Sequence, residues 1–157
     1  YLAYRPLCHQ LPERTFFLGG PQAWYSYEEL AEVLGAEAPA RYTGNAQLGY
    51  KMAFCQRDAA IFAGYLSAGL LFALWRRRGW VKPLPWQALA LATLPMAIDG
   101  LAQLFGLALS TPLRRVLTGW LFGAAAVAFA LPWLERGMAG AHLMAQEGLE
   151  ESDAGNG

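Results

Sequence analysis

The first long apolar run of the chain reads AAIFAGYLSAGLLFALW at residues 59–75 and contains no charged side chain. Three consecutive arginines, residues 76–78, follow it directly. Two further runs come later: residues 84–109, in which Asp99 is the one charged residue, and residues 116–134, which are uncharged. A helix needs about 20 apolar residues to cross a bilayer, with roughly 17–25 observed. The three runs therefore predict three transmembrane helices.

The composition agrees with a membrane setting. Of the 157 residues, 55% are apolar and 15% are charged, whereas about a quarter of the residues of a soluble domain are charged. A buried bundle in a soluble protein is the alternative, but helices of soluble proteins carry a polar stripe that these runs lack. The formal net charge is zero, so electrostatics gives no reason to expect a nucleic-acid partner. We predict an all-α fold, a polytopic transmembrane helical bundle whose main partner is the lipid bilayer.

A single membrane domain is expected over residues 1–137. Its first part, residues 1–57, is polar and carries a capping-box pattern, Ser26-Tyr27-Glu28-Glu29, which predicts a short helix from Tyr27 to about Leu34. Gly35 is expected to end that helix.

The remaining polar segments are expected to be irregular. Residues 35–50 contain the Gly, Pro and Asn residues that are typical of a loop. The acidic, glycine-rich tail at residues 138–157 is expected to be disordered. Because the chain begins at Tyr1 rather than Met, we also expect that an additional span before Tyr1 would bring the total to four.

Small residues and tryptophans mark the predicted helices. Small residues recur four positions apart in the first and third spans, and this spacing lets helix backbones approach closely in lipid; they are Ala60, Gly64, Ala68, Gly119 and Gly123. Tryptophans lie near the run ends, as interfacial anchors commonly do; they are Trp75, Trp80, Trp86, Trp120 and Trp133.

The segment between the first two runs indicates the orientation. Residues 76–82 hold four positive charges in seven residues, and short cytoplasmic loops are enriched in Lys and Arg. Positive charge also occurs elsewhere: residues 1–57 carry five Lys or Arg spread among glutamates, and Arg114-Arg115 follow the second run. The denser cluster favours a protein of the cell membrane with residues 1–57 outside the cytoplasm and the C-terminal tail inside.

Asp99 is the candidate functional residue of the second span. An ionisable side chain inside a bilayer is costly and normally faces the bundle interior beside a partner. At 1.5 Å per residue, Asp99 lies about 22 Å along that span, in its outer half, and Gln103 is one turn further on the same face. Arg57 or Arg14 would supply the partner.

Two cysteine motifs flank the polar region, and three interpretations of them stay open. The motifs are Cys8-His9-Gln10-Leu11-Pro12-Glu13-Arg14 and Cys55-Gln56-Arg57-Asp58. In an oxidising compartment the two cysteines would form a disulfide. Alternatively, Cys8, His9 and Cys55, with Asp58 or Asp99, would supply three or four ligands to Zn or Cu. In the third interpretation, an exposed thiol pair near Arg14 or Arg57 would exchange electrons.

The same motifs carry a resemblance to a known family. Residues 5–17 (RPLCHQLPERTFF), 49–62 (GYKMAFCQRDAAIF), 95–103 (PMAIDGLAQ) and 117–119 (LTG) resemble a family of small prokaryotic multi-pass membrane proteins that is catalogued only as a domain of unknown function. Thr15 stands where Ser is more usual and keeps the hydroxyl. The resemblance covers residues 1–134 and implies a multi-pass bundle, but it lends no activity.

Two classes of function remain open. In the first, the protein is a membrane-embedded enzyme or a redox or metal module that acts on a lipid-soluble substrate or one from the outer face; Asp99 would carry a proton, and Arg14 or Arg57 would bind an anion. Its catalytic residues would be Asp99, Arg57, Arg14 and Gln103, and its metal ligands Cys8, His9, Cys55 and Asp58. In the second, it is a non-catalytic partner of another protein or a small transporter, with a Cys8–Cys55 disulfide and Asp99 in an ion pair or on a proton path. Sequence motifs for ATP binding, zinc proteolysis and serine hydrolysis are absent.

Overall fold

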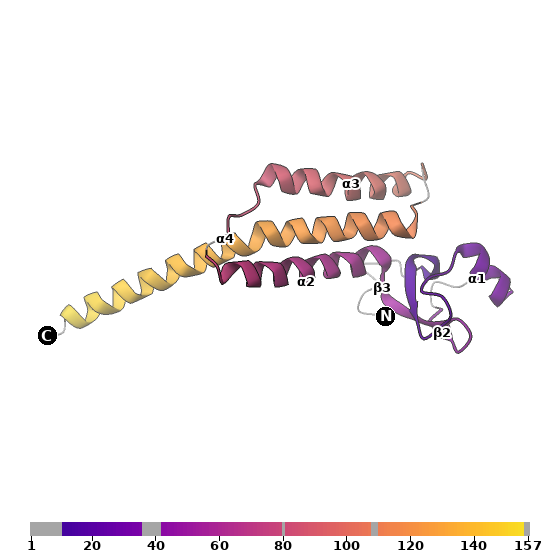
Figure 1. The fold of residues 1–157 in the computed structure, drawn as a ribbon, viewed down its shortest axis with the longest axis horizontal. Coiled ribbons are helices and arrows are strands. Elements are labelled where there is room, and N and C mark those ends of the chain that lie inside the picture. Colours follow the sequence, from indigo (N-terminus) through magenta and orange to yellow (C-terminus); the bar gives the residue numbers. More distant parts are fainter. Residues whose placement is uncertain (1–10, 36–41, 80, 108–109, 156–157) are drawn as a thin grey trace.

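The computed structural model describes residues 11–35, 42–79, 81–107 and 110–155 (Figure 1). Three long helices lie side by side, and a small unit of strands and one short helix lies beyond one end of them (Figure 1). The elements in chain order are η2 (Pro12–Arg14), β1 (Thr15–Leu18), α1 (Tyr27–Leu34), β2 (Gly44–Asn45), β3 (Gly49–Cys55), α2 (Gln56–Arg76), α3 (Trp86–Leu104) and α4 (Pro112–Gly155).

Two of the helices, α2 and α4, are long and apolar enough to cross a bilayer. Only a small share of their most apolar stretches is buried inside the protein. On α2, for example, Leu66 and Leu70 are 66% and 58% exposed. The core helix of a soluble protein buries such side chains, so these surfaces are suited to contact with lipid.

Helices α2 and α4 run in parallel and approach closely at small residues. A Cβ atom placed on Gly64 would lie 2.4 Å from the carbonyl oxygen of Trp120, and one on Gly123 would lie 2.3 Å from that of Ile61. Gly119 packs on Ala60, which a Cβ atom would approach to 3.3 Å. The prediction that these small residues let helix backbones approach closely is confirmed at these positions, and the two helices that meet there come from the first and third apolar runs.

The small unit is an antiparallel sheet with its own core, which the all-α prediction did not include. The strand order is β1-β3-β2, with Thr15 opposite Cys55 and Gly44 opposite Tyr50. Its buried core consists of Phe17, Tyr25, Leu30 and Leu48. The expected loop at residues 35–50 therefore contains β2 and the start of β3. Strands this short give little sequence signal, because their stability comes from pairing with distant residues rather than from local preference.

The predicted short helix is confirmed as α1. The Ser26 hydroxyl accepts a hydrogen bond from the backbone N–H of Glu29 at 3.2 Å, and the Ser26 N–H donates to the Glu29 carboxylate at 2.7 Å. Gly35 follows with φ 69°, a left-handed conformation that ends the helix.

Two helix boundaries differ from the prediction. Helix α3 ends at Leu104 rather than near residue 109, and Gly106 follows it with φ 68°. Helix α4 continues to Gly155, so the expectation of a disordered tail over residues 138–157 is corrected to helix as far as Gly155. Residues 138–146 are mainly Ala, Met, Leu and Gln, which favour helix, and this outweighs the glycines nearby.

Candidate functional site

Three helices bring their polar residues to one end of the bundle, next to the sheet. Helix α2 begins directly after β3, and α4 begins at the same end because the two helices are parallel (Figure 1). Helix α3 runs the opposite way: the Leu84 N–H, just before it, bonds to the Ala128 carbonyl far along α4, while Asp99 lies near the α4 start. The C-terminal part of α3 thus meets the N-terminal turns of α2 and α4.

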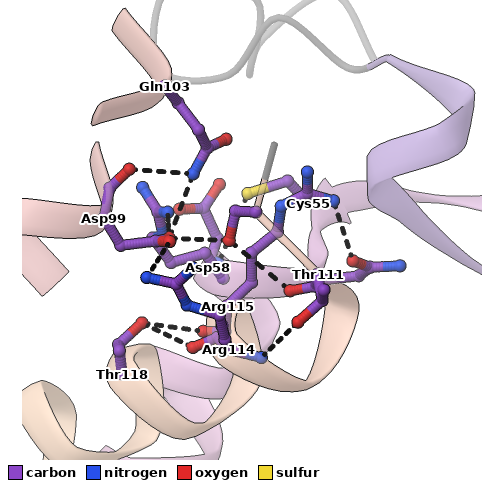
Figure 2. Close-up of polar contacts among 11 residues, drawn as sticks. Cys55, Asp58, Asp99, Gln103, Thr111, Arg114, Arg115 and Thr118 are labelled. Carbon is purple, nitrogen blue, oxygen red and sulfur yellow. Dashed lines mark hydrogen bonds and ion pairs between the residues drawn. The ribbon is translucent and has the colours of Figure 1, made fainter. Parts of the chain in front are cut away.

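The carboxylate of Asp99 lies at the centre of this end and is 2% exposed. Its Oδ2 atom accepts hydrogen bonds from Arg57, from Gln103 Nε2 at 3.0 Å and from Ser110 Oγ at 2.8 Å. Its Oδ1 atom lies 3.7 Å from Nη2 of Arg114. Figure 2 shows the Asp99 and Gln103 side chains turned toward each other, with Arg114 and Arg115 rising from α4 beneath them. Of the two partners predicted for Asp99, Arg57 or Arg14, it is Arg57 that forms the ion pair, and Gln103 lies on the same helix face as Asp99.

We call Arg57, Asp99, Gln103, Ser110, Arg114 and Arg115 the Asp99 cluster. Its three arginines outnumber its one carboxylate; next to it, Arg14 in the η2 turn adds a positive charge that repels Arg115, and Asp58 in the first turn of α2 adds a negative one. The Nε atoms of Arg57 and Arg115 are buried and have no hydrogen-bond partner among the described residues. A buried guanidinium donor normally has an acceptor. The cluster therefore has spare donors and an excess of positive charge.

A second polar contact joins the cluster to the sheet through Gln56, which is fully buried. Its Nε2 atom lies 3.4 Å from the carbonyl oxygen of Thr15 on β1, and its Oε1 atom accepts a hydrogen bond from Arg115 Nη1 at 3.3 Å. The Thr15 hydroxyl in turn donates to the Pro12 carbonyl at 2.9 Å. These buried hydrogen bonds thus connect β1, α2 and α4 to one another.

Cys55 and Asp58 lie at the start of α2, at the edge of the cluster (Figure 2). Cys55 is the N-cap of the helix, and its Sγ atom accepts a hydrogen bond from the Asp58 N–H at 3.4 Å. The sulfur therefore satisfies one of the N–H groups that a helix start leaves open. Arg115 lies within electrostatic range of Cys55.

Two of the predicted metal ligands, Cys8 and His9, lie outside the described residues. Neither the Cys8–Cys55 disulfide nor a Zn or Cu site built with these residues is tested by the geometry. Within the described ranges, no three His, Cys, Asp or Glu side chains gather as a metal site would require.

Four members of this site were not identified from sequence: Gln56, Ser110, Arg114 and Arg115. The signal for the last two was present, since an arginine pair opens the third apolar run at the end opposite the triple arginine. Two basic groups placed near a predicted intramembrane carboxylate are natural ion-pair candidates. Gln56 and Ser110 have no comparable signal, because uncharged polar residues are common at helix ends.

The profile of the family described as predicted membrane protein (DUF2085) matches residues 46–129, which is more than half of the chain. The chain belongs to this family. The DUF2085 match extends from before Cys55 to beyond Arg115 and so includes every residue of the Asp99 cluster, while Arg14 and the Cys8-His9 motif lie outside it. The resemblance to a membrane family of unknown function is confirmed.

One curated relative of this DUF2085 chain is the uncharacterized protein MJ1492 of Methanocaldococcus jannaschii. It is 30% identical over 133 residues, which cover 84% of this chain and 66% of the relative. The chain thus spans about two thirds of the length of the relative that it matches. No solved structure matches the chain.

Proposed function

We propose that this DUF2085 protein is a multi-pass membrane protein that binds an anionic group at the non-cytosolic end of its helices. In this proposal the arginines of the Asp99 cluster bind the anion, and Asp99 is their internal counter-ion. The observation that carries it is the excess of arginine over carboxylate around Asp99, whose side chain is 3% exposed.

Three spans in the predicted orientation are part of the proposal. Helices α2 and α4 meet the requirements of length and composition. Helix α3 has 19 residues and packs on α4, and at 1.5 Å per residue it is about 28 Å long, close to the hydrocarbon thickness of about 30 Å. The triple arginine at residues 76–78 lies at the end opposite the Asp99 cluster and would face the cytosol.

The electrostatics of the cluster favour an anion over a metal cation. Asp99 already accepts from Arg57, Gln103 and Ser110, so a metal ion would have to displace these donors and would be repelled by the guanidinium groups. Helices α2 and α4 both begin at the end of the bundle that holds the Asp99 cluster. Each helix N-terminus carries a partial positive charge of about half an elementary charge. Backbone N–H groups at such termini commonly bind phosphate or carboxylate groups.

The cluster also offers donors to an incoming ligand. The side chain of Arg114 is 55% exposed and is 3.7 Å from Asp99, so its guanidinium has donors free for an anion to use. Arg57 is held more tightly and is 22% exposed. Guanidinium groups bind carboxylate and phosphate through paired hydrogen bonds, which makes these two ligand groups the best matched.

Anion binding is tested with the purified protein in an uncharged detergent. Inorganic phosphate should raise the thermal unfolding midpoint, followed by tryptophan fluorescence, more than chloride does at the same ionic strength, because a ligand that binds only the folded state stabilises it. Arg114→Gln should remove most of this difference. Arg136→Gln, an exposed arginine toward the other end of α4, is the matched control and should leave it unchanged. Equal effects of phosphate and chloride on the wild type, or a full phosphate effect in Arg114→Gln, would contradict the proposal.

A further inference from the structure

At the end opposite the Asp99 cluster, a groove lies between α2 and α4. It has a volume of about 720 Å³ and is lined by the apolar side chains of Phe72, Leu131, Leu134 and Met138 and by the polar side chains of Arg76 and His142. A second groove of about 610 Å³ adjoins it, since the two share Phe72, Arg76 and Glu135, and Arg77 also lines this second groove. We call the two together the α2–α4 groove.

Along α2, the lining of the groove changes from apolar at Phe72 and Ala73 to basic at Arg76 and Arg77. Because α2 and α4 are parallel, Phe72 and Leu131 lie toward the middle of the bundle, while Arg76 and His142 lie further toward the C-terminal ends. A ligand that fits this gradient has an apolar chain at one end and a polar head at the other.

Exposed tryptophans place the groove at the level of a membrane surface. Trp75 on α2, Trp86 on α3 and Trp133 on α4 are 57%, 67% and 56% exposed. The Leu84–Ala128 hydrogen bond sets the start of α3 beside this part of α4, so the three tryptophans belong to the same end of the bundle. Tryptophan is enriched where a membrane protein passes from hydrocarbon to water.

The polar end of the groove has unbalanced positive charge. Arg76 forms an ion pair with Glu135, which neutralises it. Arg77 and Arg78 are exposed, and within the described ranges neither is in an ion pair. Lys82, also exposed, adds a further positive charge a few residues on. An anionic head at this level would therefore be attracted.

We propose that the α2–α4 groove binds one anionic phospholipid, with an acyl chain along Phe72 and Leu131 and the phosphate headgroup at Arg77. This lipid site is separate from the anion site at the Asp99 cluster, which lies at the other end of the same helices. The lipid site depends on the membrane setting and not on which side of the membrane faces the cytosol.

Lipid binding is measured by native mass spectrometry of the purified protein with equal amounts of phosphatidylglycerol and phosphatidylcholine of identical acyl chains. The wild type should retain phosphatidylglycerol in preference. Arg77→Gln should lower this preference about fivefold, the effect of one basic residue near a membrane surface. Arg78→Gln removes the same charge from the neighbouring residue, which does not line the groove, and should change the preference much less.

A second variant tests the apolar part of the groove. Ala139→Phe adds a ring at a residue that lines the larger groove and should displace both lipids, while circular dichroism checks that the helix content is kept. Three results would overturn the proposal: no preference of the wild type for phosphatidylglycerol, equal losses in Arg77→Gln and Arg78→Gln, or wild-type lipid binding by Ala139→Phe with intact helices.

Discussion

Replacing Asp99 by Asn removes the charge at the centre of the Asp99 cluster while almost preserving the shape of the side chain. The Asn oxygen can still accept hydrogen bonds from Gln103 and Ser110, which donate to Asp99 at 3.0 and 2.8 Å. The variant loses the negative charge that compensates the positive charges of Arg57 and Arg114. The variant therefore isolates the electrostatic role of the carboxylate.

The magnitude follows from how deeply each partner is buried. Removing one member of a fully buried ion pair costs about 3–5 kcal/mol, because the other charge is left without compensation. Here Arg57 is 22% exposed and Arg114 is 55% exposed, so water compensates part of the loss. We expect Asp99→Asn to lower the free energy of unfolding by about 2–3 kcal/mol.

The assay is unfolding by titration with sodium dodecyl sulfate in mixed micelles, followed by circular dichroism. Asp58→Asn is the matched control: Asp58 is at the same end of the bundle, but in the described part of the chain no arginine or lysine pairs with it, so the expected loss is under about 1 kcal/mol. The double variant Asp99→Asn with Arg57→Gln should lose at least about 1 kcal/mol less than the sum of the single losses, because both remove the same interaction. Additive losses, or a loss in Asp99→Asn no larger than in Asp58→Asn, would refute the reasoning.

Four further predictions follow from other parts of the molecule. Gly64→Ala should destabilise the protein by about 1–3 kcal/mol, because its Cβ would lie 2.4 Å from the Trp120 carbonyl oxygen. Gly69→Ala on the same helix is the control and should not destabilise the protein, because its Cβ would have no atom within 4 Å. Equal effects of the two variants would argue against close α2–α4 packing. Hydrogen bonds from the Ser26 backbone and, to a smaller extent, from its hydroxyl hold the pKa of Glu29 below its usual value. The capping box therefore stabilises α1 fully at a pH above the unfolded-state pKa of Glu29, and this stabilisation is lost as the pH falls through the folded-state pKa. NMR titration should give a higher Glu29 pKa in Ser26→Ala, and an unchanged pKa would contradict this. Compared with the wild type, a Gly79→Cys variant, at an exposed position in the basic segment, should gain reaction with a membrane-impermeant maleimide in inverted vesicles and none in intact cells. The reverse pattern would overturn the orientation. The state of the cysteines separates the three interpretations of Cys8 and Cys55. Denatured protein purified without chelators should contain no titratable thiol if the two form a disulfide, two thiols with one equivalent of bound Zn or Cu if they bind metal, and two fast-reacting thiols without metal if they exchange electrons.

Much of the helical part of the fold can be predicted from sequence because its signals are local. The uncharged run at residues 59–75 became the body of α2, and Ser26, Glu29 and Gly35 define both ends of α1. Each of these signals depends on residues within one or two helical turns. The strands depend instead on pairing across long separations, such as Thr15 with Cys55, and their local sequence resembles a loop.

The candidate site could be predicted in part, for a related reason. A lone carboxylate in an apolar run requires a counter-ion, and Arg57 lies just before the first apolar run, so it could be named in advance as one of two candidate partners, the other being Arg14. The contact between Gln56 and Arg115 joins residues 59 positions apart. Nothing in either local sequence says that these two side chains meet, because that depends on α2 and α4 lying in parallel.

The direct passage from β3 into α2 has a mechanical consequence. Cys55 is the last residue of the strand and the cap of the helix, so no loop separates them to absorb a rotation. Arg57 lies in the first turn after this junction, and Gln56 bonds to the opposite strand. A tilt of the sheet would therefore turn the start of α2 with it and would shift the Arg57 guanidinium relative to Asp99. The orientation of the sheet is thus coupled to the geometry of this ion pair, although the sheet lies outside the helices that hold the pair.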